Sequence, residues 1–239
     1  MAFLSLNLIL LGALGGCVHP GTRPHDMGMD AHEAEAADAD AAASSHAAQF
    51  DPNAVKTAEQ CHAGRGGRVC WTRVTNPTQE HRQEAEAMAR IAEEHRAASA
   101  ALREAEATAC AGLAEEDRDV SPFAYVEDIA GVEPLTVSRG GGKLPRSEVT
   151  VGAVVTVRAV PGLTAEWLQR VVDCHVARGA SLGHVVPEMP DCPLVPQGVS
   201  ARVTSTGTGF AVELRSEDSD AAGDILARAR RLVAARAAP

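Results

Sequence analysis

The strongest constraint on the fold is a run of alternating side chains in the second half of the chain. Apolar residues recur at every second position from Val149 to Ala159, and small or polar residues fill most of the positions between them. A period of two predicts a long β-strand with one buried face. Pro161-Gly162 then turns the chain. The segment that follows has apolar side chains at helical spacing and predicts an α-helix, with Thr164 as its cap.

Two further strands and a second helix are predicted beyond the proline-rich loop that follows. Alternation returns in residues 199–203 and 210–214, on either side of a Gly207-Thr208-Gly209 turn, and this pattern is typical of a β-hairpin. A last helix is expected with Ser219 as its cap, acidic residues in its first turn and arginines toward its end, the order that a helix dipole favours. Residues 148–239 are therefore expected to form strand–helix–strand–strand–helix.

That order of elements predicts an α+β fold, a small two-layer sandwich. It resembles an incomplete ferredoxin-like domain (β-α-β-β-α), in which a strand near Val132–Val137 would fill the missing edge. Short strands and the glycine-rich loop Gly140–Lys143 are expected across residues 112–147. Aromatic residues make up only 3% of the chain, so the core of such a domain must be thin.

The amino terminus carries a short apolar segment that ends at a cysteine. Residues 2–16 are too few and too rich in glycine for a permanent membrane span, so residues 1–16 are predicted to be a signal peptide. The segment ends in Leu14-Gly15-Gly16-Cys17, which resembles the lipobox of bacterial lipoprotein precursors. The resemblance implies cleavage before Cys17 and a lipid on that cysteine. It places the protein in the cell envelope, on the periplasmic face of the outer membrane in preference to the inner membrane.

No Lys or Arg precedes this apolar segment, whereas signals of this kind usually begin with a positive charge. An ordinary signal peptide cut elsewhere and an uncleaved anchor are the alternatives.

Three segments separate the predicted lipid from the small domain. Residues 17–50 are acidic and alanine-rich, and they predict a disordered tether because a helix of such residues would have no face to bury. Residues 51–77 contain two cysteines and several glycines and predict a looped element. Residues 78–111 lack glycine and proline and predict one long amphipathic helix. Its seam repeats every seven residues at His81, Met88, His95, Leu102 and Ala109.

Export would place the other five cysteines in an oxidising space, where disulfides persist. Short spacings predict the disulfides Cys61–Cys70 and Cys174–Cys192 and leave Cys110 as an unpaired thiol. Two alternatives use the same residues. Cys110, Cys174 and Cys192 could bind a metal together with His175, although adjacent residues on a helix point about 100° apart. A thiol-based redox protein would need Cys110 or Cys174 with a lowered pKa.

The predicted tether contains a second candidate metal site. His25, Met27, Met29 and His32 combine imidazole and thioether groups, which suit copper, with zinc as the other candidate. No other cofactor is expected. His81 and His95 lie about 21 Å apart along the long helix and cannot share one ion.

Net charge and sequence motifs exclude some classes of function. The net charge of −10 argues against nucleic-acid binding, which needs a basic surface. The GxSxG string of residues 179–183 follows a helix, whereas a nucleophile elbow lies between a strand and a helix, so it does not predict a hydrolase. We therefore expect a non-catalytic binding or scaffolding protein, held at the membrane through Cys17 and contacting a protein partner in the envelope. A lipoprotein that handles copper or zinc is the alternative.

Overall fold

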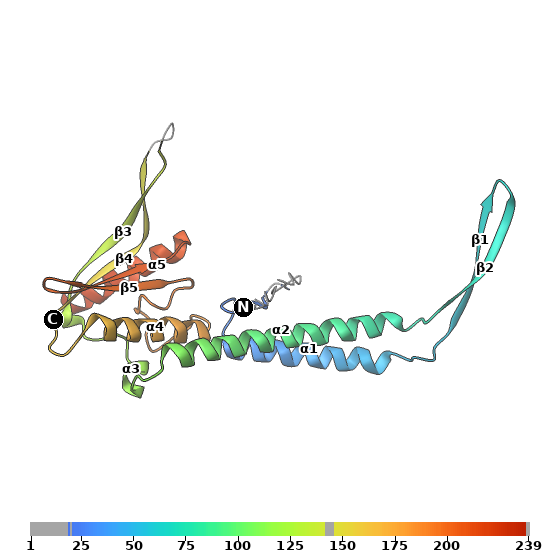
Figure 1. Ribbon diagram of the computed structural model, residues 1–239, viewed down its shortest axis with the longest axis horizontal. Coiled ribbons are helices and arrows are strands. Elements are labelled where there is room, and N and C mark those ends of the chain that lie inside the picture. The colour runs from blue at the N-terminus through green and yellow to red at the C-terminus, as the bar shows by residue number, and fades with distance from the viewer. Residues whose placement is uncertain (1–18, 20, 142–145, 238–239) are drawn as a thin grey trace, which may run out of the picture.

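The computed structural model describes residues 19, 21–141 and 146–237. It combines an α+β domain with a long helical arm that ends in a β-hairpin (Figure 1). Within the described residues, no helix has both the length and the apolar character needed to cross a bilayer. Cys17 and the predicted signal peptide lie outside the described residues.

The predicted α+β fold is confirmed, and its sheet contains four antiparallel strands. The strands are β3 (Ile129–Arg139), β4 (Ser147–Arg158), β5 (Ser200–Thr206) and β6 (Gly209–Arg215), in the order β3-β4-β6-β5. β3 pairs with β4 and occupies the edge that a β-α-β-β-α order leaves empty. The segment before β3 forms two short helices, α3 (Glu115–Asp119) and η1 (Val126–Asp128), where strands were expected to begin.

Two helices form the second layer of the domain. In α4 (Ala165–Ser181) the first turn is capped as predicted, because the Thr164 hydroxyl accepts a hydrogen bond from the backbone N–H of Trp167 at 3.2 Å. In the second helix, α5 (Ser219–Ala237), Ser219 is the first helical residue and not the cap that was predicted. The cap is Asp218, whose carboxylate accepts hydrogen bonds from two backbone N–H groups of the first turn.

The core between sheet and helices is built from medium-sized side chains. β4 buries every second residue from Val151 to Val157, as the alternation predicts. Phe123 and Phe210 are the aromatic members of the buried cluster, and its remaining side chains are mainly aliphatic. They include Val155, Val172, Leu194, Leu214 and Ile225.

The prediction of a disordered tether is wrong for most of residues 17–50, because residues 29–49 form helix α1 (Met29–Gln49). It lies antiparallel beside α2 (Gln79–Ala109), and the two helices make the arm (Figure 1). The predicted long helix over residues 78–111 is confirmed, and its 31 residues correspond to about 46 Å.

Alanine itself explains why this helix pair forms. Ala36 and Ala39 of α1 are 3% and 8% exposed, and Ala92 and Ala98 of α2 are 0% and 2% exposed. Small side chains let two backbones approach closely, so an alanine face that cannot fold alone is buried once a second helix covers it.

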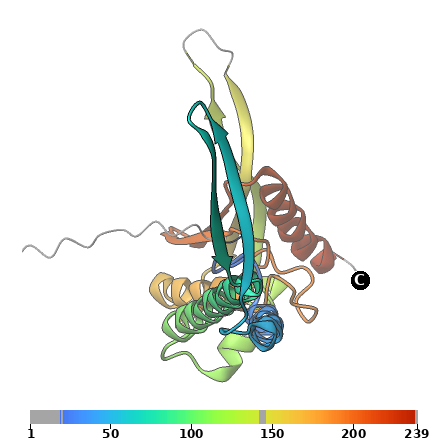
Figure 2. The same cartoon turned by 90° about the vertical axis from the view of Figure 1, so that its right-hand side faces the viewer.

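Residues 51–77 contain a β-hairpin where a loop was predicted. Strands β1 (Lys56–Gly64) and β2 (Gly67–Thr75) pair along their whole length. Gly67 has a φ of 111°, a conformation that favours glycine, and it completes the tight turn between them. The hairpin extends from the far end of the arm, and Figure 2, viewed along the arm, shows it pointing to the same side as β3 and β4.

Candidate functional site

The β1–β2 hairpin is the most exposed part of the described chain. All nine residues of each strand are exposed, so within the described residues the hairpin packs on no helix and on no second sheet. Val69, Trp71 and Val74 nevertheless keep large apolar side chains that are 65%, 49% and 64% exposed. These side chains contribute nothing to a core of this chain and remain available to another molecule.

The register of the strands divides the hairpin into two faces. Val69 lies opposite His62, and Trp71 lies opposite Gln60, so one face carries the aromatic ring. The other face carries the predicted disulfide between Cys61 and Cys70, which is confirmed. A two-stranded hairpin alone is marginally stable in water, so this cross-link helps to hold the strands together.

Charge also separates the hairpin from the rest of the chain. Positions 56–75 contain one acidic residue, Glu59, and four basic residues: Lys56, Arg65, Arg68 and Arg73. The whole chain, in contrast, has a net charge of −10. The hairpin therefore presents a basic surface with apolar side chains at the end of an acidic protein.

Two pairs of histidines join the helices of the arm. The Nδ1 atoms of His32 and His95 are 3.0 Å apart, and those of His46 and His81 are 3.3 Å apart. The spacing along the sequence is the same on both helices, because 14 residues separate the two histidines of α1 and the two of α2. Fourteen residues are two heptads, so both pairs lie on the seam of the antiparallel helices.

The two pairs have different surroundings. His32 and His95 are 0% and 5% exposed, and burial together with the neighbouring His95 lowers the pKa of His32. His46 and His81 are half-buried at the hairpin end of the arm. Glu84 reaches them: its Oε2 is 2.8 Å from His46 Nδ1 and 3.6 Å from His81 Nδ1.

Of the predicted tether ligands, Met29 and His32 belong to α1, whereas His25 and Met27 lie in the turn before it. His32 contacts His95 inside the arm. His25 lies beside the α+β domain, where the side chain of Gln197 donates a hydrogen bond to its backbone carbonyl at 3.0 Å. Two of the four candidate ligands therefore belong to a helix, where a disordered tether is predicted.

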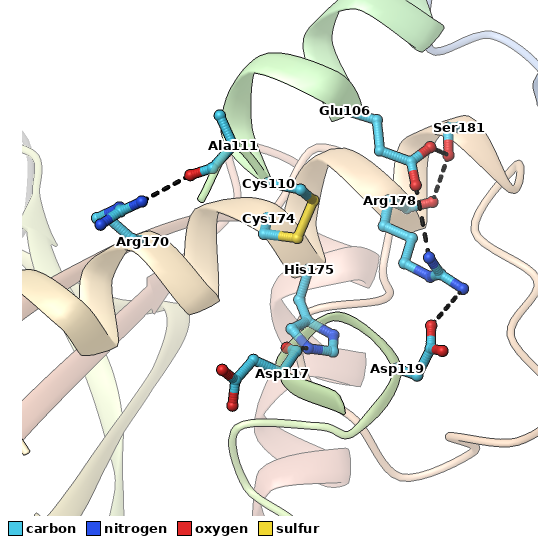
Figure 3. Close-up of a disulfide and its surroundings, with 10 residues drawn as sticks. All are labelled: Glu106, Cys110, Ala111, Asp117, Asp119, Arg170, Cys174, His175, Arg178 and Ser181. Atoms are coloured by element: carbon cyan, nitrogen blue, oxygen red, sulfur yellow. Dashed lines mark hydrogen bonds and ion pairs between the residues drawn. A yellow bond between two sulfur atoms is a disulfide. The ribbon is translucent and has the colours of Figure 1, made fainter. Parts of the chain in front are cut away.

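A second disulfide attaches the arm to the domain, and it corrects the predicted pairing (Figure 3). Cys174 bonds to Cys110, whereas Cys192 is a buried free thiol, so the predicted Cys174–Cys192 bridge and the predicted unpaired Cys110 are both wrong. The end of α2 lies against α4 and brings the Cα atoms of Cys110 and Cys174 to 4.6 Å. Sequence spacing favours local pairs and contains no information on this long-range contact.

Polar contacts surround this junction (Figure 3). Glu106 of α2 accepts a hydrogen bond from the Ser181 hydroxyl at 2.5 Å and lies 3.6 Å from the Arg178 guanidinium of α4. Arg170 donates to the backbone carbonyl of Ala111 at 2.6 Å. The arm is thus fixed to α4 by a covalent bond and by hydrogen bonds on either side of it.

These contacts also bear on the alternative roles of the cysteines. Cys110 and Cys174 are 3% and 0% exposed, so an external thiol cannot reach their sulfurs in the folded protein. Burial raises the pKa of the Cys192 thiol, which keeps it in the unreactive neutral form. His175, predicted as a ligand partner, instead has its Nε2 3.1 Å from the backbone carbonyl of Asp117.

The GxSxG string lies at the end of α4. Ser181 contacts the Glu106 carboxylate, and His184 places its Nδ1 2.8 Å from the backbone carbonyl of Val195. Beside the opposite end of α4 is a cleft of about 420 Å³. Its lining includes the aromatic residues Tyr125 and Trp167 and the acidic residues Glu116, Asp117 and Asp128.

Sequence reasoning missed His46 and Glu84, because their segments were considered separately as a tether and a helix. The repeated 14-residue spacing of the histidines is the signal that could have indicated the pairing.

Comparison with known proteins returned no match to a family model, to a curated protein or to a solved structure.

Proposed function

We propose that this protein is a lipid-anchored protein of the cell envelope that acts as a non-catalytic binding module. Its contact surface is the β1–β2 hairpin, and its partner is an envelope protein with an acidic surface that accepts apolar side chains. The observation that carries this proposal is a cross-linked hairpin whose 18 strand residues are all exposed and include Trp71.

The chemistry of the hairpin supports binding to a protein. Tryptophan and arginine are enriched where proteins bind one another, because each offers a large contact area together with a polar group. One face of β2 carries Val69, Trp71 and Arg73, because side chains two positions apart in a strand point to the same side. The excess of positive charge favours an acidic partner and increases the rate of encounter with it.

The arm supports the same function. Two paired helices are stiffer than a disordered linker, and the Cys110–Cys174 disulfide holds their base on the α+β domain. The hairpin is therefore held about 46 Å from the junction, the length of α2, in a defined direction. Such an arm suits a protein that reaches a partner from a fixed position.

The envelope location is supported by the two disulfides and by the lipobox-like sequence at Cys17. A lipid there would restrict the protein to a membrane surface and would raise the local concentration of a partner in the same compartment.

Site-specific photo-cross-linking in living cells tests the proposal. A photoreactive residue at position 69 or 71 should yield one discrete cross-linked protein. Position 72, on the opposite face of β2, and position 93, on the exposed surface of α2, are the controls and should yield little.

A Trp71→Ala substitution tests the same surface. Because position 71 is exposed, folding should be unchanged, while cross-linking from position 69 should fall at least about tenfold, as expected for a central aromatic contact. Equal cross-linking from both faces and from position 93, or cross-linking unaffected by Trp71→Ala, would refute the proposal. A cross-linked product with the mass of two copies of this chain would assign the surface to self-association instead.

A further inference from the structure

We propose that His46, His81 and Glu84 form a binding site for a divalent transition-metal ion, with zinc as the best fit. The site lies between α1 and α2 at the end of the arm that carries the hairpin. It does not depend on the identity of any hairpin partner.

Distances between the three candidate ligand atoms match those of a metal site. His46 Nδ1 and His81 Nδ1 are 3.3 Å apart, and Glu84 Oε2 is 2.8 Å and 3.6 Å from them. Ligands bound to tetrahedral zinc at 2.0–2.1 Å lie about 3.3 Å from each other. One ion placed on one side of this triangle would therefore contact all three atoms without a large movement of the helices.

The donor set has the chemistry that zinc prefers. Two imidazole nitrogens and one carboxylate oxygen make a three-ligand site that leaves the fourth tetrahedral position open. The side chains of His46, His81 and Glu84 are 30%, 35% and 41% exposed, so water can reach that position and an ion can enter. The hard ions magnesium and calcium prefer sites made only of oxygen ligands, which this site is not.

The helices hold the ligands in place before any ion binds. His81 and Glu84 are three residues apart on α2, a spacing that puts both side chains on one face of a helix. His46 comes from the last turn of α1, and the pairing of α1 with α2 directs it at the other two.

The second histidine pair lacks two features of the proposed metal site, solvent access and a third ligand. His32 and His95 are as close as His46 and His81, but both are buried and no carboxylate completes a group of three with them in the described residues. The other group of three potential ligands, Glu59 with Cys61 and Cys70, is blocked because its sulfurs are joined in a disulfide. Only the pair next to Glu84 has both access and a third donor within the described residues.

The position of the site gives the ion a structural consequence. His46 lies three residues before the end of α1 and His81 two residues after the start of α2, next to the connections to β1 and β2. The opposite end of α2 is already joined to α4 by Cys110–Cys174. An ion would thus fix the free end of the arm, from which the hairpin extends (Figure 1).

Calorimetric titration with ZnCl₂ tests the proposal on the full chain, purified in detergent without a polyhistidine tag and treated with a chelator. We expect one equivalent of Zn²⁺ to bind with a Kd of about 10 μM or tighter, because the helices hold two imidazoles and one carboxylate together before the ion binds. His46→Gln and His81→Gln should each weaken binding at least about a hundredfold, and Glu84→Gln at least about tenfold. Co²⁺ in place of Zn²⁺ should give the visible absorption bands of a tetrahedral site.

Two matched controls complete the experiment. His62→Gln removes an exposed histidine of β1, and His95→Gln removes the buried pair, so both should leave the Zn²⁺ affinity within about twofold of the unmodified chain, with helicity monitored by circular dichroism. Binding no tighter than about 1 mM would overturn the proposal. Affinity that survives both His46→Gln and His81→Gln, in variants that keep their helicity, would also overturn it.

Discussion

Removal of the Cys110–Cys174 disulfide should lower the stability of the protein more than any other change at a cysteine. The bond closes a loop with a sequence separation of 64 residues, for which loop entropy predicts about 4 kcal/mol. Typical domains are stable by only about 5–15 kcal/mol, so this is a large share of the total. For a chain of this size the melting temperature should fall by about 8–16 °C.

The variant to measure is the double substitution Cys110→Ala/Cys174→Ala, which leaves no new free thiol. Urea unfolding followed by circular dichroism gives the free energy of unfolding. Cys192→Ala is the matched control: it removes one buried sulfur that is not in a disulfide, so it should cost only about 1 kcal/mol. Peptide mapping of the unreduced protein should show a linked pair containing residues 110 and 174, with residue 192 alkylated after unfolding.

The hairpin disulfide supplies a second control. Cys61→Ala/Cys70→Ala should loosen β1 and β2 but leave the free energy of unfolding of the α+β domain within about 0.5 kcal/mol, because every residue of the two strands is exposed in the described structure. A larger loss from Cys192→Ala than from the Cys110/Cys174 pair, or a linked peptide pair containing residues 174 and 192, would refute the reasoning.

Four other perturbations have expected outcomes. Burial lowers the pKa of three histidines below the value they have in the unfolded chain, so the unfolded chain binds more protons. The free energy of unfolding, measured with urea, should therefore fall as the pH drops below about 6.5. The loss is at most about 1.4 kcal/mol per pH unit for each histidine. These histidines are His32, His175 and His184. A stability that is constant between pH 7 and pH 5 would contradict this reasoning. Ser181→Ala should lower the free energy of unfolding by about 1–3 kcal/mol, because it leaves the carboxylate of Glu106 without its hydroxyl donor. Arg103→Gln should lower it by less than about 1 kcal/mol, because the ion pair between Arg103 and Glu33 is exposed. Gly28→Ala should cost about 1–3 kcal/mol of stability, measured by thermal melting, because the added Cβ atom would lie 2.7 Å from the backbone nitrogen of Gly183. An unchanged melting temperature would show that α1 does not begin against the end of α4.

The α+β domain was predictable because its sequence signals are local. The alternation in β4, the Thr164 cap and the hairpin turn at Gly207-Thr208-Gly209 each act within a few residues, and each has its expected place in the structure. Even the β3 edge strand followed from the vacancy in the predicted order of strands.

The arm was not predictable by the same means because its signal is shared between two distant segments. α1 has no apolar face of its own, and its alanines become buried only against α2. The partner of Cys110 likewise lies 64 residues away and depends on how the end of α2 meets α4. The candidate metal ligands follow the same logic, since His46 and Glu84 come together only when the two helices pair.

Both proposals depend on the register of the arm, and a nuclear Overhauser experiment on protein with labelled histidines measures it directly. The ring centroids of His32 and His95 are 5.3 Å apart, and those of His46 and His81 are 5.6 Å apart. Cross-peaks between the imidazole protons are therefore expected within both pairs and not between them. Random-coil shifts for His32 and His46, without a cross-peak to either histidine of α2, would contradict the paired helices and with them the arm.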